Sequence, residues 1–151
     1  MRFRYFPFFI LILLISIPNN VSALNLVINQ DDTVKFSEVE EVPLYPDCMT
    51  LNFPKDKMRE CTDQAIKIFA RSSFNTELSN DLGLKGYQRI TTSFIIDKSG
   101  KIVNIRVRAP HPDLEKEAIR MINSLPIMQP GRQNGEAVSV SYLLPIIFQV
   151  Q

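Results

Sequence analysis

Two stretches of alternating apolar and polar residues, joined by a short turn, constrain this chain more than any other feature. Residues 87–97 and 102–108 both alternate with the period of two that is typical of a strand. Asp97-Lys98-Ser99-Gly100 lies between them, and glycine accepts the positive φ that tight turns often need. The pattern predicts a β-hairpin with one apolar face, which other elements have to cover. We expect this face to contain Ile90, Phe94, Ile96, Val103, Ile105 and Val107.

Two segments with helical spacing can supply that cover. Residues 57–71 carry a stripe made of Met58, Cys61, Ala65, Ile68 and Phe69. Residues 112–125 begin at a proline, which suits a first helical turn, and carry a stripe made of Leu114, Ala118, Met121, Ile122 and Leu125. Residues 138–148 alternate again, and Pro145 argues for an edge strand or a bulge because it cannot donate to a ladder. The order predicts an α+β domain, with two helices packed on one face of a small three-stranded antiparallel sheet.

The first 23 residues have the layout of a secretory signal peptide. Arg2 and Arg4 precede 13 uncharged residues, and Val21-Ser22-Ala23 places small or moderate residues at the expected cut. A membrane span needs about 20 apolar residues, so the run is short for one, although an uncleaved anchor stays open. We therefore expect export, followed by an acidic linker over residues 24–41 and a folded domain over residues 42–151.

Export changes the meaning of the two cysteines, Cys48 and Cys61. In an oxidising compartment an even pair is most simply one disulfide, and here the two residues are 13 positions apart. A loop of that size contributes roughly 3 kcal/mol in the chain-entropy model. A reactive thiol or a zinc pair is the alternative. One His and two Cys argue against a larger metal site, and we expect no cofactor.

Other chemistry has weak support. His111 lies beside Asp113, which suits acid–base catalysis, but polar residues at a helix start are more simply caps. There is no glycine-rich phosphate loop, so we expect no enzyme and no small-molecule substrate. The net charge of +1 excludes a generally basic nucleic-acid binder. Arg89, Arg106 and Arg108 could form a basic strip on the open sheet face, either solvated or facing an anionic partner.

Residues 42–151 carry a series of short stretches that together form a recognisable pattern. No single stretch is specific, but their order and spacing are. The stretches are Val42-Pro43-Leu44-Tyr45-Pro46, Gly83-Leu84-Lys85-Gly86, Phe94-Ile95-Ile96-Asp97-Lys98-Ser99-Gly100, Ile105-Arg106-Val107, Leu114-Glu115-Lys116-Glu117-Ala118, Pro126, Pro130-Gly131-Arg132-Gln133-Asn134-Gly135 and Leu144-Pro145-Ile146-Ile147-Phe148. In this order and spacing they resemble the C-terminal domain of the TonB energy transducers.

The resemblance implies protein binding in the periplasm and a part in TonB-dependent transmembrane transport. TonB-like domains capture the TonB box, a short extended peptide of an outer-membrane transporter, by adding it as a strand to the sheet edge. By position, residues 138–148 are the matching strand. The peptide-binding residues expected on it are Val138, Ser139, Val140, Ser141, Tyr142, Leu143, Leu144 and Ile146. The alternative is a strand-exchanged homodimer with a structural or regulatory role in the envelope and no energy transduction.

Three departures from the family pattern affect these expectations. A full TonB has an uncleaved anchor and a long proline-rich spacer, whereas residues 24–41 span roughly 60 Å when fully extended. If the signal is cleaved, nothing ties the domain to the inner membrane. Phe74-Asn75-Thr76 stands where many members have Tyr-Pro, and Met128 lies near the place of a frequent Trp. The last two changes concern the detail of the peptide groove.

Overall fold

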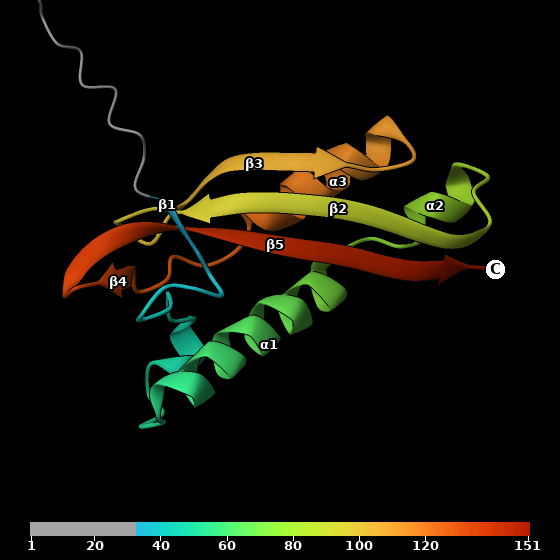
Figure 1. Cartoon of the computed structure of the whole chain (residues 1–151). Helices are drawn as coiled ribbons and strands as arrows, with labels where there is room; N and C mark the ends of the chain where they lie inside the picture. Colours follow the sequence, from blue (N-terminus) through green and yellow to red (C-terminus); the bar gives the residue numbers. More distant parts are fainter. Residues whose placement is uncertain (1–32) are drawn as a thin grey trace, which may run out of the picture.

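The computed structural model describes residues 33–151 (Figure 1). The signal peptide expected at residues 1–23 and the first part of the expected linker, residues 24–32, lie outside the described residues. The elements follow in the order β1 (Thr33–Lys35), a 3-10 turn η1 (Pro46–Cys48), α1 (Lys55–Ser73), α2 (Leu78–Asp81), β2 (Gly86–Ile96), β3 (Ile102–Arg108), α3 (Pro112–Asn123), β4 (Gly131–Gln133) and β5 (Glu136–Val150).

The sheet confirms the α+β class but is larger than predicted. Its strands lie in the order β1-β5-β2-β3, and β4 pairs with the start of β5. Among the three expected strands, β2 is antiparallel to both β3 and β5, while β1 adds to β5 in parallel. The prediction of three strands was wrong because β1 and β4 have three residues each, too few for an alternating pattern to stand out.

The hairpin of β2 and β3 has the predicted turn and one unpredicted irregularity. Asp97 Oδ1 accepts bonds from the Ser99 and Lys101 amides at 2.8 and 3.0 Å, and Gly100 has a φ of 81°. The register between the strands shifts opposite Ser93 and Ile95, where Asn104 has a φ of 52°. This β-bulge reverses the faces at the start of β3. Ile102 therefore lies against the core and Val103 pairs with Ile95 on the other face, so the inward position predicted for Val103 was wrong.

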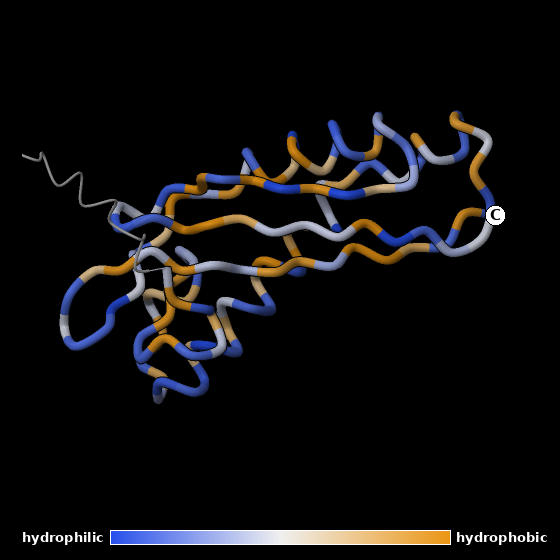
Figure 2. Tube along the Cα trace, turned by 45° about the horizontal axis from the view of Figure 1, so that its top comes forward, coloured by the Kyte–Doolittle hydropathy of each residue, from blue (hydrophilic) through white to orange (hydrophobic). Residues whose placement is uncertain are grey.

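Both long helices cover the same face of the sheet. Figure 1 shows α3 behind β2 and β3, with α1 beside β5. Apolar and polar positions alternate along the helices and strands (Figure 2), as burial on one side requires. The predicted stripe of α3 is confirmed, since all five of its residues are buried. The shared core contains Ile66, Ala70, Phe74, Ile90, Phe94, Ile96, Leu114, Ala118, Met121, Ile122, Leu125, Met128, Tyr142 and Leu144.

The buried stripe of α1 is rotated from the predicted one. Thr62, Ile66 and Ala70 are buried, whereas Ile68 is 61% exposed. A disulfide joins Cys61 to Cys48, which confirms the predicted pairing. This disulfide is the reason for the rotation of the buried stripe. Cys61 faces the segment around η1, so the face beside it contacts the sheet. The stripe chosen from the sequence included Cys61 and was displaced by about one position.

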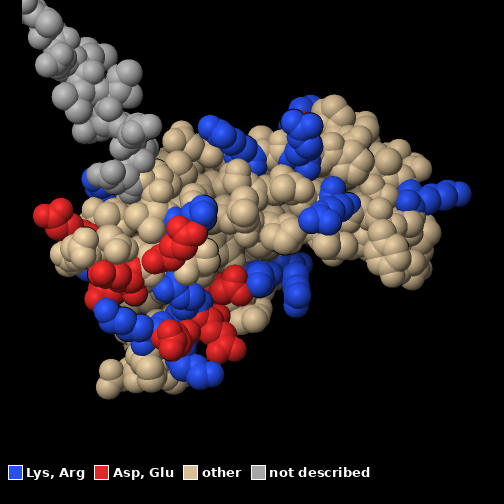
Figure 3. Space-filling model, viewed as in Figure 1, with Lys and Arg blue, Asp and Glu red and all other residues tan. Residues whose placement is uncertain are grey.

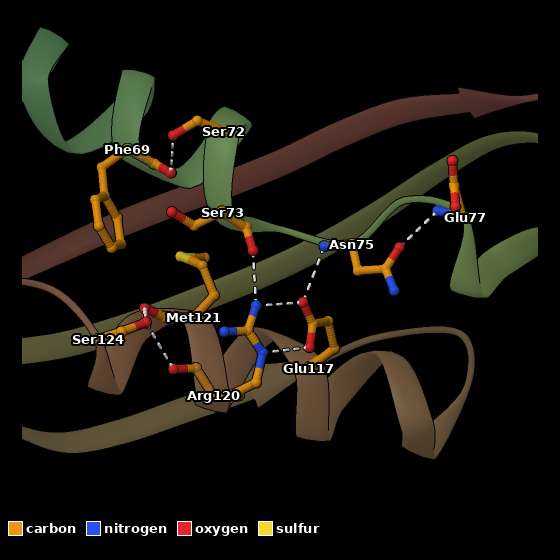
Figure 4. A network of polar contacts seen from close by, with 9 residues as sticks. All are labelled: Phe69, Ser72, Ser73, Asn75, Glu77, Glu117, Arg120, Met121 and Ser124. Atoms are coloured by element: carbon orange, nitrogen blue, oxygen red, sulfur yellow. Dashed lines mark hydrogen bonds and ion pairs between the residues drawn. The ribbon is translucent and has the colours of Figure 1, made fainter.

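A polar network joins the end of α1 to α3 (Figure 4). Arg120 on α3 donates to the Ser73 carbonyl at 2.7 Å and to both carboxylate oxygens of Glu117. Glu117 also accepts from the Asn75 amide at 2.9 Å. The hydrogen bond from Arg120 lowers the pKa of Glu117, against the opposing effect of partial burial. These contacts hold the chain as it leaves α1, where helix carbonyls lack partners of their own.

Residues 33–41 belong by sequence to the expected acidic linker, yet in the structure they lie against the sheet. Val39 is buried in a small second cluster with Val42 and Val140. We call residues 33–39 the strap. Within residues 33–151, no helix is both long and apolar enough to cross a membrane.

Candidate peptide-binding edge

β5 contains every residue predicted to bind a peptide. It pairs with β2 without interruption from Val140, opposite Ile96, to Val150, opposite Gly86. The Ser141 carbonyl accepts from the Phe36 amide at 3.0 Å, so it points away from β2. Because backbone groups alternate along an antiparallel ladder, those of Leu143, Pro145, Ile147 and Gln149 point away from β2 as well.

Seven of the eight predicted residues fall into three groups in the structure, and the eighth, Leu143, lies on the stretch of β5 that runs from residue 143 to residue 149. Val138 pairs with Gly131 of β4. Ser139, Val140 and Ser141 lie opposite Thr33, Val34 and Lys35 of β1. Tyr142, Leu144 and Ile146 direct their side chains to the core, and their backbone groups face β2.

Residues 143–149 of β5 form what we call the open edge. No strand among the described residues pairs with it on the side away from β2. Leu143 and Ile147, which place side chains on the face opposite the helices, are 72% and 59% exposed. Pro145 lies opposite Thr91 within an unbroken register, and its nitrogen points to the open side. A proline at this position removes no hydrogen bond from the sheet, so the edge-strand interpretation of Pro145 is confirmed.

Tyr142 joins β5 to α1 at the start of the open edge. Its hydroxyl donates to Asp63 Oδ1 at 2.7 Å, and Asp63 Oδ2 lies 2.7 Å from Lys67 Nζ. Burial, together with the hydrogen bond to Asp63, raises the pKa of Tyr142 well above its usual value. The ring lies between Phe36 and Phe94, with centroid distances of 4.9 and 5.4 Å. Tyr142 is therefore held in place by contacts with α1, β2 and the segment around Phe36.

A groove follows the open edge between β5 and the second half of α1. Lys67, Ala70 and Arg71 line one side, and the other side is residues 144–147 of β5. Its volume is about 260 Å³. Arg71 has no ion-pair partner among residues 33–151. The two charged residues that line the helix side of the groove, Lys67 and Arg71, are therefore both basic. Of the two, Lys67 is paired with Asp63.

The remaining predicted groups lie elsewhere. His111 caps α3 and accepts from the Asp113 amide at 3.2 Å, which confirms the capping interpretation. Arg89, Arg106 and Arg108 are exposed on the face without helices. Acidic side chains visible in Figure 3 gather at the end with β1, β4 and the start of α1, whereas the opposite end shows only basic ones. Across residues 33–151, no three His, Cys, Asp or Glu side chains are grouped to hold a metal ion.

Two features of this region were not predicted from the sequence. One is the strap, whose Thr33-Val34-Lys35-Phe36 run does alternate, but over too few residues to stand out among acidic neighbours. The other is the face of α1 that lies toward the strap and β5, because its residues Arg59, Asp63, Lys67 and Arg71 have the composition of an ordinary solvated helix face. Only the packing of α1 beside β5 gives these residues a role.

The fold and the edge define a small α+β domain with an unpaired sheet edge beside a helix. Residues 77–150 match the family of the Gram-negative bacterial TonB protein C-terminal domain, and this part of the chain belongs to that family. Its members are periplasmic protein-interaction domains. The match confirms the resemblance from α2 to β5, while the strap, the disulfide and α1 precede it. No curated protein matches the chain.

Proposed function

We propose that this domain binds the TonB box of an outer-membrane transporter by strand addition to β5, in support of TonB-dependent transport. The observation that carries the proposal is the open edge itself, in a member of the TonB C-terminal family. Unpaired backbone groups on an edge strand bind an extended peptide with little demand on its sequence. The outward groups of Leu143, Ile147 and Gln149 offer both donors and acceptors, and Pro145 offers an acceptor only.

The surroundings of the open edge suit an extended peptide. Side chains of an added strand point alternately to the two faces of the sheet. On one face they would meet Leu143 and Ile147, which are exposed and apolar. On the other they would enter the groove beside Lys67 and Arg71. The proposed ligand therefore has apolar residues on one side and tolerates an acidic residue on the other.

The proposed location is the periplasm, reached by cleavage after residue 23. The disulfide between Cys48 and Cys61 supports it, since disulfides persist in oxidising compartments. Without an anchor the domain would bind transporters as an adaptor or competitor. With the segment uncleaved, it would be a short-armed transducer. The intact mass of the protein from its native envelope, compared with that of residues 24–151 and of the full chain, separates these cases.

The test uses peptides that cover the periplasmic N-terminal segments of the transporters from the same organism. We expect one or more to bind in calorimetric titration and to slow amide exchange at Leu143, Ile147 and Gln149. The matched control is the same peptide methylated on alternate amide nitrogens, which keeps its side chains but cannot complete a ladder. Binding that survives methylation, or that leaves these three amides unprotected, would overturn strand addition.

The same edge could instead pair with a second copy of the chain. Pro145 interrupts the row of donors and limits such pairing. Sedimentation across a wide concentration range tests for such a homodimer. A monomer mass that stays constant over the range excludes it. A dimer whose β5 amides are protected without peptide would favour the structural role.

A further inference from the structure

The strap occupies part of the same edge that the proposed function uses. β1 runs parallel to β5, with Thr33, Val34 and Lys35 opposite Ser139, Val140 and Ser141. The Phe36 amide adds a further bond to the Ser141 carbonyl at 3.0 Å. The chain thus adds a strand of its own to the edge, in the way that a bound peptide would.

Contacts from α1 hold the strap in place. Arg59 donates to the Phe36 carbonyl and to the Val39 carbonyl, the latter at 2.7 Å. Its guanidinium carbon lies 5.9 Å from the centre of the Phe36 ring. That ring meets Tyr142 edge to face at 4.9 Å. Val39 is 1% exposed, so the strap is anchored at its far end by burial as well.

The strap leaves the edge abruptly after Phe36. The Glu38 and Val39 amides both bond to the Lys35 carbonyl, at 2.9 and 3.0 Å, which closes a turn. The turn carries the chain away from residues 143–149 and toward Val42, with Val39 packed against Val42 and Val140. Residues 143–149 therefore stay open while residues 139–141 are paired.

We infer that the strap is a built-in strand that closes residues 139–141, so that a partner's strand is received only at residues 143–149. This inference rests on the proposed function for the identity of the partner. It divides the predicted peptide-binding strand in two, an internally paired part and a receiving part. The partner's paired segment can then be no longer than about seven residues, because strands pair residue by residue. A longer partner segment has to turn away from β5 at Phe36 or displace the strap.

The test compares Val34→Pro with Val34→Ala in the full chain. Proline at position 34 removes the amide hydrogen of a strand residue and disfavours pairing, whereas alanine keeps that hydrogen and removes more of the apolar side chain than proline does. A larger effect of proline than of alanine therefore reports the lost strand pairing and not lost side-chain packing. Amide exchange is followed residue by residue by NMR. We expect Ser139 and Ser141 to exchange at least tenfold faster in Val34→Pro and little faster in Val34→Ala.

Two peptides then probe the edge. A synthetic copy of residues 31–39 should protect Ser139 and Ser141 in Val34→Pro and should not bind the wild type. A transporter peptide should protect only residues 143–149 in the wild type, and should extend its footprint to residues 139–141 and bind several-fold tighter in Val34→Pro. A wild-type footprint that reaches Ser139 with loss of protection at Phe36 would overturn the inference, as would identical footprints in both proteins. If no transporter peptide binds either protein, the proposed function fails, and binding of the strap copy still decides whether the strap closes the edge.

Discussion

Tyr142→Phe removes one buried oxygen at the junction of the strap, β5 and α1. Tyr142 is 3% exposed, and its hydroxyl donates to Asp63 at 2.7 Å. A hydrogen bond to a charged group contributes about 1.5–3 kcal/mol. Asp63 keeps Lys67, and its side chain is 28% exposed, so water compensates in part. We therefore expect the free energy of unfolding to fall by about 1.5 kcal/mol, near the lower limit of that range.

The assay is denaturant and thermal unfolding, with Tyr87→Phe as the matched control. Tyr87 lies on the adjacent strand, is 78% exposed and should change stability by less than about 0.5 kcal/mol. For a domain of this size, 1 kcal/mol corresponds to roughly 4 °C, so Tyr142→Phe should lower Tm by about 6 °C. Equal stabilities of the two variants would refute the energetic role assigned to the Tyr142–Asp63 bond.

The pH dependence gives an independent check on the same group. The pKa of Tyr142 is raised in the folded state, so the folded protein retains the phenolic proton longer than the unfolded chain does. Its stabilising contribution is complete below the unfolded pKa of about 10 and is lost as the pH rises above it. The stability difference between wild type and Tyr142→Phe should therefore shrink above about pH 10. A difference that stays constant into that range would contradict the assignment.

Three further predictions follow from other contacts. Replacing both Cys48 and Cys61 by Ala should lower the free energy of unfolding by roughly 3 kcal/mol, and reductant should destabilise the wild type but not this variant. Gly100→Ala should destabilise strongly, because the added Cβ would lie 1.7 Å from the Met128 carbonyl oxygen. Gly135→Ala is the matched control, since Gly135 has the same φ of 81° and nothing within 4 Å of an added Cβ. In equilibrium unfolding this control should lose only about 1 kcal/mol. Glu117→Gln should destabilise at neutral pH, since the pKa of Glu117 is lowered in the folded state. That difference should persist above the ordinary pKa of 4.5 and vanish as the pH falls through the lowered value; a difference that persists in acid would exclude the Arg120–Glu117 pair as its source.

Local pattern was a good guide to the long elements. The hairpin, α3 and β5 appear where their periodicity predicts them, because each buries one face against the same core. Val103 and the stripe of α1 were wrong for reasons that periodicity does not contain. A bulge at Asn104 reverses the alternation within β3, and the disulfide turns the face of α1 toward η1. Both depend on pairing with another element of the chain, β2 for the bulge and η1 for the disulfide.

The candidate edge likewise has one feature that the sequence predicted and others that it could not. Pro145 predicted an edge strand or a bulge from sequence alone, since a missing amide hydrogen is tolerated only where no ladder bond is lost. The sequence could not show that Thr33–Lys35 pairs with residues 139–141, because three residues carry little periodic signal and the partner lies more than a hundred positions away. Nor could it show that α1 forms one wall of a groove.

By itself the sequence determined the α+β class, the pairing of the two cysteines and the family, since these depend on local periodicity, on counting and on the order of short stretches. Only the tertiary structure decided which part of β5 is open. That depends on where the strap crosses the edge and on how α1 packs beside it. Both arrangements are settled by burial of Val39, Phe36 and Tyr142 and by the bonds from Arg59, interactions that exist only once distant segments have been brought together.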